Sequence, residues 1–223
     1  MFLEIKLHFA KKNEAKTMKS TKEKILQRIK KQKAGYAFSA KDFLDEFKRY
    51  EVDVALSTLA KEGVIRRIIP GIYELVHQIK VLGIWIDTAS DFYNVAEALA
   101  RKFNWRIFPS GNTALNYLGL STQIPGRICL LSDGPSRRYD VKGMEIEFKH
   151  VSQHELLFKH QESVLVVQAL KALGKEHLNA KVITLLRRRY PKELWEKISQ
   201  DTCKSCGWIH DFIQIVSEQG GEP

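Results

Sequence analysis

Apolar residues recur at helical spacing from Ser20 onward. The four residues Ser20–Glu23 have the form of a capping box, in which the first and fourth residues exchange side-chain and backbone hydrogen bonds at the start of a helix. Ile25, Leu26 and Ile29 then fall on one helical face, and Gly35 follows the last turn. The pattern therefore predicts an amphipathic first helix that ends before Gly35.

Two more helices are predicted between residues 39 and 63. The second begins at Ser39, and its buried side is formed by Phe43, Leu44 and Phe47. The third has apolar residues at i, i+3, i+4 and i+7, which are Val52, Ala55, Leu56 and Leu59. Gly63 ends this helix, because a residue without a Cβ atom readily takes the left-handed conformation that closes a helix.

A basic hairpin follows the third helix. Residues 64–69 are rich in β-branched side chains, Pro70-Gly71 supplies a turn, and residues 72–74 form the return strand. Helices in this order, followed by a hairpin, are the elements of a winged helix-turn-helix, whose second paired helix enters the DNA major groove. We therefore expect an α+β protein with an N-terminal winged helix-turn-helix over residues 18–77.

Both strands and helices are predicted in residues 78–223, which we assign to a mixed α/β C-terminal domain. Residues 77–88 have the pattern of a β-like connector. Strands are predicted at 105–108, 128–131, 137–141 and 145–150, and helices at 91–103, 112–118, 162–173 and 180–189. A last amphipathic helix includes Leu194, Trp195 and Ile198, before a loose tail at 219–223. The domain is expected to be a small antiparallel sheet flanked by helices.

Positive charge is concentrated in the N-terminal part of the chain. The net charge is +10, and residues 1–77 contain 17 Lys and Arg against 10 Asp and Glu. Such an excess favours phosphate-rich partners through counterion release, although a solvated basic surface would have the same composition. Residues 1–17 form an N-terminal extension, or translation begins at Met18. The sequence contains no apolar run long enough to span a membrane, and its N-terminus does not have the pattern of a signal peptide. We therefore expect a cytoplasmic protein without a membrane partner.

Double-stranded operator DNA is the partner that a winged helix with basic residues predicts. The third helix should present its N-terminal outward residues to bases, while the arginines of the hairpin contact the backbone or the minor groove. The candidate DNA contacts are Ser39, Lys41, Arg49, Tyr50, Asp53, Ser57, Lys61, Arg66 and Arg67. The outward face contains no Arg, Asn or Gln beyond the turn, so phosphate contacts should supply much of the affinity.

Two stretches further along the chain resemble the AbiEi-like antitoxins, a family of winged-helix regulators from type IV toxin-antitoxin systems. They are PSGNTALNYLGLSTQIP (residues 109–125) and LLSDGPSRR (130–138), supported by FSAKDFLD (38–45), ALSTLAKEGVIRR (55–67) and GIY (71–73). The resemblance covers most of residues 20–189. The residues of the motif in the C-terminal domain are Ser110, Gly111, Leu120, Ser121, Thr122, Gln123, Asp133, Arg137 and Arg138.

The resemblance implies a transcriptional repressor that regulates its own operon and an antitoxin that counters a nucleotidyltransferase toxin in abortive infection. It leaves open whether the toxin is bound directly or opposed indirectly. The oligomeric state is also open, although a palindromic operator would favour two copies about one helical turn apart. A protein-interaction module without DNA binding is the alternative, since winged helices also serve that purpose.

Enzyme chemistry is not expected, and neither is a cofactor. The sequence has no phosphate-binding GxxxxGK[ST] loop, no HExxH and no GxSxG; residues 119–123 have Gln where such an elbow needs Gly. His150, His154 and His160 with Glu155 match no common ligand spacing. Cys203-x2-Cys206 with His210 is only part of a zinc motif. A nucleic-acid-processing enzyme is therefore the weaker alternative.

Overall fold

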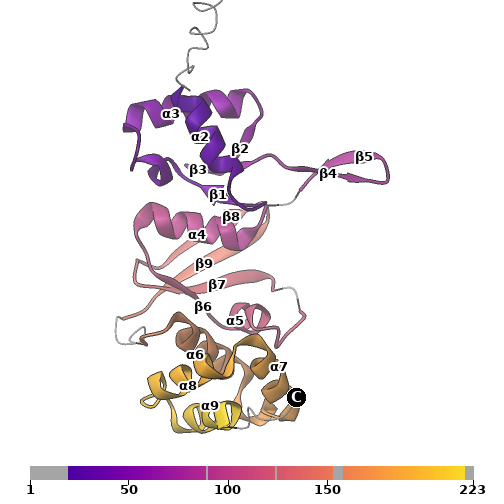
Figure 1. The fold of residues 1–223 in the computed structure, drawn as a ribbon, viewed down its shortest axis with the longest axis vertical. Coiled ribbons are helices and arrows are strands. Elements are labelled where there is room, and N and C mark those ends of the chain that lie inside the picture. The colour runs from indigo at the N-terminus through magenta and orange to yellow at the C-terminus, as the bar shows by residue number, and fades with distance from the viewer. Residues whose placement is uncertain (1–19, 89, 124, 153–157, 219–223) are drawn as a thin grey trace, which may run out of the picture. The chain divides into compact units, whose positions relative to one another are not determined.

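The computed structural model describes residues 20–88, 90–123, 125–152 and 158–218, and it divides into two compact units after Asp91 (Figure 1). The expectations for residues 1–17, Met18, His154, Glu155 and the tail 219–223 lie outside the described residues.

The helices of the first unit pack around one apolar core. They are α2 (Thr21–Lys30), the 3₁₀ helix η1 (Ala40–Phe43) and α3 (Arg49–Lys61). Helix α2 begins with the predicted capping box of Ser20 and Glu23, which confirms the expected start. Helix α3 buries Val52, Ala55, Leu56 and Leu59 as its spacing predicts, and Gly63 follows with φ of +70°.

The second predicted helix is shorter than expected. Phe43 is buried, but Leu44 is exposed, because the helical segment is the single 3₁₀ turn η1 and the chain then turns toward α3. The Asp42 carboxylate accepts hydrogen bonds from both the backbone N–H and the hydroxyl of Ser39. These hydrogen bonds favour a tight turn over a longer helix, because a side chain that bonds to nearby backbone groups stabilises the turn.

Three short strands form one sheet of the first unit. They are β1 (Ala37–Phe38), β2 (Ile65–Ile69) and β3 (Ile72–Leu75), in the order β1-β3-β2, and all pairs are antiparallel. The turn at Pro70-Gly71 connects β2 to β3, as predicted, and the register shifts between Arg67 and Ile69. The buried side of the sheet contributes Phe38 and Ile65 to the core beneath α2 and α3.

The segment predicted as a connector is a separate hairpin of the first unit. Strands β4 (Gln78–Val81) and β5 (Ile84–Asp87) pair antiparallel around Leu82-Gly83, and Figure 1 shows the hairpin projecting from the body of this unit. Both turn residues have positive φ, as a tight hairpin turn requires. The first unit thus extends beyond residue 77, where the sequence analysis placed the domain boundary.

A four-stranded sheet lies at the centre of the second unit. Its strands are β6 (Ile107–Pro109), β7 (Arg127–Ser132), β8 (Arg137–Val141) and β9 (Met144–His150), in the order β6-β7-β9-β8. The prediction of an antiparallel sheet was wrong for one pair, because β7 and β9 run parallel. The reason is topological: the tight turn at Lys142-Gly143 folds β9 back between β8 and β7.

Helices fill the rest of the second unit. They are α4 (Phe92–Phe103), α5 (Asn112–Tyr117), α6 (Gln161–Leu173), η3 (Lys175–His177), α7 (Ala180–Arg189), α8 (Lys192–Asp201) and α9 (Gly207–Glu218). The predicted last helix is α8, which buries Trp195 and Ile198, but α9 follows it and was missed. Helix α9 buries Ile209, Phe212 and Ile213 in the same core.

The expected mixture of helices and sheets is confirmed: the protein is α+β. Within the described ranges, no helix combines the length and the apolar composition that crossing a bilayer requires.

Candidate functional site

The outward face of α3 contains most of the candidate DNA contacts. Arg49, Tyr50, Asp53, Ser57 and Lys61 are all exposed, and Tyr50 is 79% exposed. Arg49, Asp53, Ser57 and Lys61 are each four residues apart, and Tyr50 is three residues before Asp53, so they lie in one stripe along the helix, opposite the side chains that enter the core. The stripe contains two cations, Arg49 and Lys61, together with the Asp53 carboxylate, the Ser57 hydroxyl and the Tyr50 phenol. It contains no Asn or Gln side chain.

Two further candidates are exposed outside α3. Lys41 lies on η1, and Arg67 lies on β2 of the β2–β3 hairpin. Both side chains are long cations, which suit phosphate contacts better than base recognition because a phosphate requires only charge and a donor.

Arg49 is ion-paired within the stripe. Its Nε donates to the Asp53 carboxylate at 2.8 Å, one helical turn further on. Both side chains are more than half exposed, so water and salt screen the pair and its contribution to stability is small, ~0.3–0.5 kcal/mol. The guanidinium can consequently exchange Asp53 for another anion at low free-energy cost.

Ser39 and Arg66 do not belong to the exposed surface. Ser39 is 2% exposed and donates to Asp42, as described above. Arg66 lies between acceptors at the base of the β4–β5 hairpin: it donates to the carboxylates of Glu74 and Asp87 and to the backbone carbonyl of Thr88. Both residues therefore hold the first unit together.

Glu74 is a buried acid that the sequence analysis did not single out. Its side chain is 3% exposed, and it accepts hydrogen bonds from Arg66 and from the Ser90 hydroxyl at 2.8 Å. Two features of the sequence could have revealed it. Glu74 stands two residues after the buried Ile72, on the same side of the strand, and it is the cross-strand neighbour of a basic residue.

The first half of the C-terminal motif forms the two ends of α5. Ser110 and Gly111 precede the helix, and Gly111 has φ of +57°. The stretch Leu120–Gln123 follows the helix and is held by two hydrogen bonds. The side-chain Nδ2 of Asn116 donates to the backbone carbonyl of Gln123 at 2.6 Å, and the Ser121 hydroxyl accepts from the backbone N–H of Gln123 at 3.2 Å. Thr122 is exposed in this turn.

The second half of the motif supports the sheet. The Asp133 carboxylate accepts the backbone N–H of Arg106 at 2.8 Å, which ties the β7–β8 connection to the start of β6. The Arg137 guanidinium lies over the rings of Phe103 and Trp105, 5.5 and 5.7 Å from their centroids. These contacts stabilise the second unit by hydrogen bonding and cation–π attraction.

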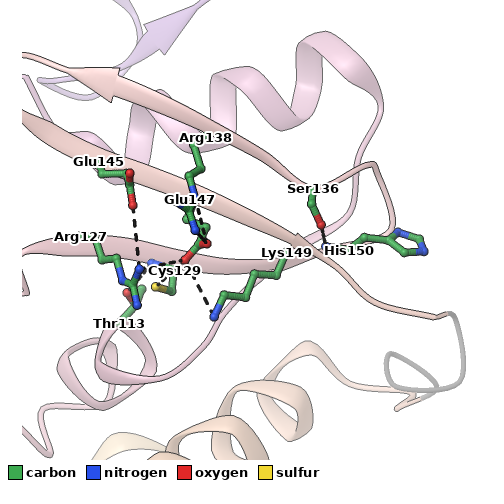
Figure 2. A network of polar contacts seen from close by, with 9 residues as sticks. All are labelled: Thr113, Arg127, Cys129, Ser136, Arg138, Glu145, Glu147, Lys149 and His150. Atoms are coloured by element: carbon green, nitrogen blue, oxygen red, sulfur yellow. Dashed lines mark hydrogen bonds and ion pairs between the residues drawn. The ribbon is translucent and has the colours of Figure 1, made fainter.

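Arg138 is part of a polar network centred on Glu147 of β9 (Figure 2). The Glu147 side chain is 8% exposed, and Arg138 of β8 donates to its Oε1 through Nε at 3.1 Å and Nη2 at 2.8 Å. Arg127 of β7 and Lys149 of β9 approach its Oε2 at 3.6 and 3.9 Å. Figure 2 shows that the three cations converge on this carboxylate from different strands.

A cleft of about 870 Å³ opens beside the network. The start of α5, strands β7 and β9, and helix α6 form its walls. Its lining consists of Ser110, Gly111, Asn112, Thr113, Pro125, Gly126, Arg127, Cys129, Leu131, Glu145, Lys149, Gln168, Lys171 and Ala172. The structure thus brings Ser110 and Gly111 of the motif together with basic residues that sequence reasoning did not identify.

The ionisation of the network follows from its geometry. Burial would raise the pKa of Glu147, but the hydrogen bond from Arg138 and the charges of Lys149, Arg138 and Arg127 outweigh it, so the pKa lies below its ordinary value. Burial raises the pKa of the neighbouring Cys129 thiol. The glutamate is therefore ionised and the thiol protonated at neutral pH, which makes Cys129 a poor nucleophile.

Among the residues that the structure describes, which exclude His154 and Glu155, no group of three or more His, Cys, Asp or Glu side chains is placed to hold a metal ion. His150 is occupied in the β8–β9 region: its backbone N–H donates to the Ser136 hydroxyl at 2.9 Å, and its Nδ1 lies 2.9 Å from the carbonyl oxygen of Gly134. Cys203 and Cys206 are free and exposed between α8 and α9.

Comparison with known proteins gives one family. Residues 24–198 match DUF6088, a family of unknown function, and the chain belongs to this family. A search of the curated proteins finds no match. The matched range includes the α3 stripe, the Arg66–Glu74 pair and the whole lining of the cleft.

Proposed function

We propose that the protein is a DNA-binding repressor and antitoxin of the AbiEi type, in which the first unit is a winged helix-turn-helix. The observation that carries the DNA-binding part is the exposed stripe of α3, whose opposite face is fixed against α2 and η1. In this proposal α3 enters the major groove and the β2–β3 hairpin is the wing.

The phosphate contacts are assigned to exposed cations. Arg49 and Lys61 lie at the two ends of the α3 stripe, and Arg67 lies on the wing. Arg66 and Ser39 are left out of the interface because their donors are already used inside the first unit. Tyr50 and Ser57 face the bases in this arrangement, where a hydroxyl discriminates only weakly between them.

Salt dependence of binding tests the DNA-binding part. The full chain should bind a duplex from upstream of its own reading frame, and the logarithm of the affinity should fall linearly with the logarithm of the salt concentration. The double variant Arg49→Ala/Lys61→Ala should reduce that slope by about 0.9 for each lost phosphate contact. Lys197→Ala, an exposed lysine on α8, is the matched control.

Unchanged affinity and an unchanged salt slope in the double variant would contradict the proposal that α3 contacts DNA phosphates. Absence of duplex binding by the unaltered chain at low salt would sink the DNA-binding proposal as a whole.

The antitoxin part rests on the resemblance of residues 109–125 and 130–138, which lie entirely in the second unit. Its test is growth of cells that express the product of the neighbouring gene, which this proposal expects to be a nucleotidyltransferase. Co-expression of the full chain should restore growth. If the toxin still arrests growth, or if the neighbouring gene encodes no nucleotidyltransferase, the antitoxin part fails while the DNA-binding part can stand.

One observation favours a protein-interaction module as the second candidate. Tyr50 and Val54 are exposed one helical turn apart on α3, and Leu44 is exposed just before the helix. Exposed apolar side chains close together are typical of protein interfaces. Val54→Ser separates the two candidates, because it should weaken a protein complex and leave the salt slope of DNA binding unchanged.

A further inference from the structure

We propose that the cleft of the second unit binds a small, multiply phosphorylated anion of the nucleoside-triphosphate class. This inference is independent of the proposed DNA binding by the first unit, since every lining residue lies in the second unit.

The cleft has the size of a small-molecule site. Its volume of about 870 Å³ falls in the range of ~300–1,000 Å³ that ligand pockets in proteins occupy. The lining comes from separate elements, with β7 and β9 side by side in parallel pairing and α5 and α6 beside them. A concave, solvent-open site bordered by several elements suits a small ligand better than the rod-like backbone of a duplex.

Three cations line the cleft, each from a different element. Arg127 begins β7, Lys149 is near the end of β9, and Lys171 lies in the last turn of α6. Glu145 is the one acidic residue in the lining, so the lining has a formal excess of two positive charges. A single phosphate dianion could balance this excess, but a chain of two or three phosphates can contact cations on separate walls at once, which a single phosphate cannot do.

The cations can turn to a ligand without exposing the buried acid beneath them. Arg138 already supplies two hydrogen bonds to Glu147 from β8, outside the cleft lining. Arg127 and Lys149 approach Glu147 at 3.6 and 3.9 Å, beyond ordinary hydrogen-bond distance, and both side chains are about half exposed. Their contact with Glu147 is therefore purely coulombic, and a phosphate could replace it.

Uncharged groups complete the site. Asn112 and Gln168 provide amide donors and acceptors for the neutral part of a nucleotide. Cys129, whose pKa is raised by burial, adds no negative charge to the cleft at neutral pH. None of the lining residues is aromatic, so a base would be held by hydrogen bonds rather than by stacking.

Calorimetric titration of the full chain with ATP, tripolyphosphate and AMP at constant ionic strength tests this proposal. Wild type should bind ATP and tripolyphosphate and bind AMP at least tenfold more weakly. Lys171→Glu should weaken ATP binding roughly tenfold or more, as expected for the loss of a charge-assisted contact. Lys181→Ala, an exposed lysine on α7 outside the lining, should change the affinity less than twofold.

Lys171 is the residue of choice because it is exposed and does not contact Glu147, so its substitution should leave the unfolding temperature unchanged. Arg127→Gln is the second variant, because Arg127 lines the cleft from strand β7 and not from α6.

Three results would overturn the proposal: no heat of binding with ATP or tripolyphosphate at millimolar concentration, equal affinity for AMP and ATP, or unchanged ATP affinity in both variants. Loss of duplex binding in Lys171→Glu with ATP binding intact would also overturn it, because the cleft would then belong to a nucleic-acid surface. Failure of DNA binding by the first unit would leave the ATP result unaffected.

Discussion

Arg66 on β2 donates a hydrogen bond to the buried carboxylate of Glu74, its cross-strand neighbour on β3. The same guanidinium reaches Asp87 and the carbonyl of Thr88 at the end of the β4–β5 hairpin. One arginine therefore connects two sheets of the first unit. Arg67, the next residue along the strand, is exposed.

Replacing Arg66 should destabilise the first unit. Arg66→Ala would remove the guanidinium that pairs with the buried Glu74 carboxylate, and removal of one member of a buried pair costs about 3 kcal/mol. The measurement is the free energy of unfolding from urea titration. Arg67→Ala is the matched control and should change stability by less than about 0.5 kcal/mol.

The two arginines should have opposite effects on DNA. At a temperature where both variants are folded, Arg67→Ala should weaken duplex binding and Arg66→Ala should not. Equal stability of the two variants would contradict the structural role of Arg66.

Acid should destabilise the second unit. The pKa values of Glu147 and Asp201 lie below their ordinary values, so the native state binds fewer protons than the unfolded state as the pH falls. For Asp201, burial would raise the pKa, but the backbone N–H groups of Lys159 and His160 outweigh it by donating to the carboxylate. The stabilisation is complete above the ordinary pKa values of 4.5 and 3.8, and it is lost progressively as the pH falls from these values through the lower pKa values of the native state.

Unfolding temperatures measured between pH 7 and pH 3 check this expectation. Asp201→Asn should lower stability at neutral pH and flatten the acid limb of the curve, because the group that titrates is gone. Glu196→Gln, at an exposed position of the same helix, should preserve the limb. An identical acid limb in Asp201→Asn and wild type would argue against the role of this carboxylate.

Local patterns were sufficient to predict the elements with strong periodicity. The Ser20 capping box and the four buried residues of α3 are confirmed because their causes, a cap and an amphipathic face, act within one or two helical turns. Helix η1 was overestimated because the Ser39–Asp42 hydrogen bonds favour a tight turn that apolar spacing alone does not reveal.

Long-range pairing was beyond local patterns. The parallel β7–β9 pair forms because β9 and not β8 lies next to β7 in the sheet. The spacing of apolar residues within each strand does not determine which of the two strands pairs with β7. The same holds for the candidate sites. The exposed stripe of α3 follows from helical periodicity, but the cleft combines residues from positions 110 to 172, which only the tertiary fold brings together.

Cysteine labelling should separate the three thiols. Burial raises the pKa of Cys129, whereas Cys203 and Cys206 are exposed. Since the thiolate is the reactive form, a maleimide or iodoacetamide at pH 7 should modify Cys203 and Cys206 first and Cys129 much more slowly. Peptide mass spectrometry over a time course checks the order. Cys129→Ser should leave the fast phase unchanged, and fast labelling of Cys129 in the folded protein would contradict its partly buried setting.

Gly134 should tolerate no larger residue, because the Trp105 ring occupies the space where a Cβ would stand. A Cβ built there would lie 2.3 Å from Nε1 of Trp105. The ring cannot move freely, since it stacks on Phe103 with centroids 4.7 Å apart and meets Phe148 edge-on at 5.5 Å. Gly134→Ala should therefore destabilise the protein by about 1–3 kcal/mol through overpacking.

Thermal unfolding compares Gly134→Ala with Gly207→Ala at the start of α9, where a Cβ would meet nothing within 4 Å. The control should be neutral or slightly stabilising, because alanine reduces the entropy of the unfolded chain. A double-mutant cycle isolates the cause: in a Trp105→Ala background the penalty of Gly134→Ala should disappear. If the penalty persists without the ring, it arises from the backbone of the β7–β8 turn and the close approach of Trp105 is not its origin.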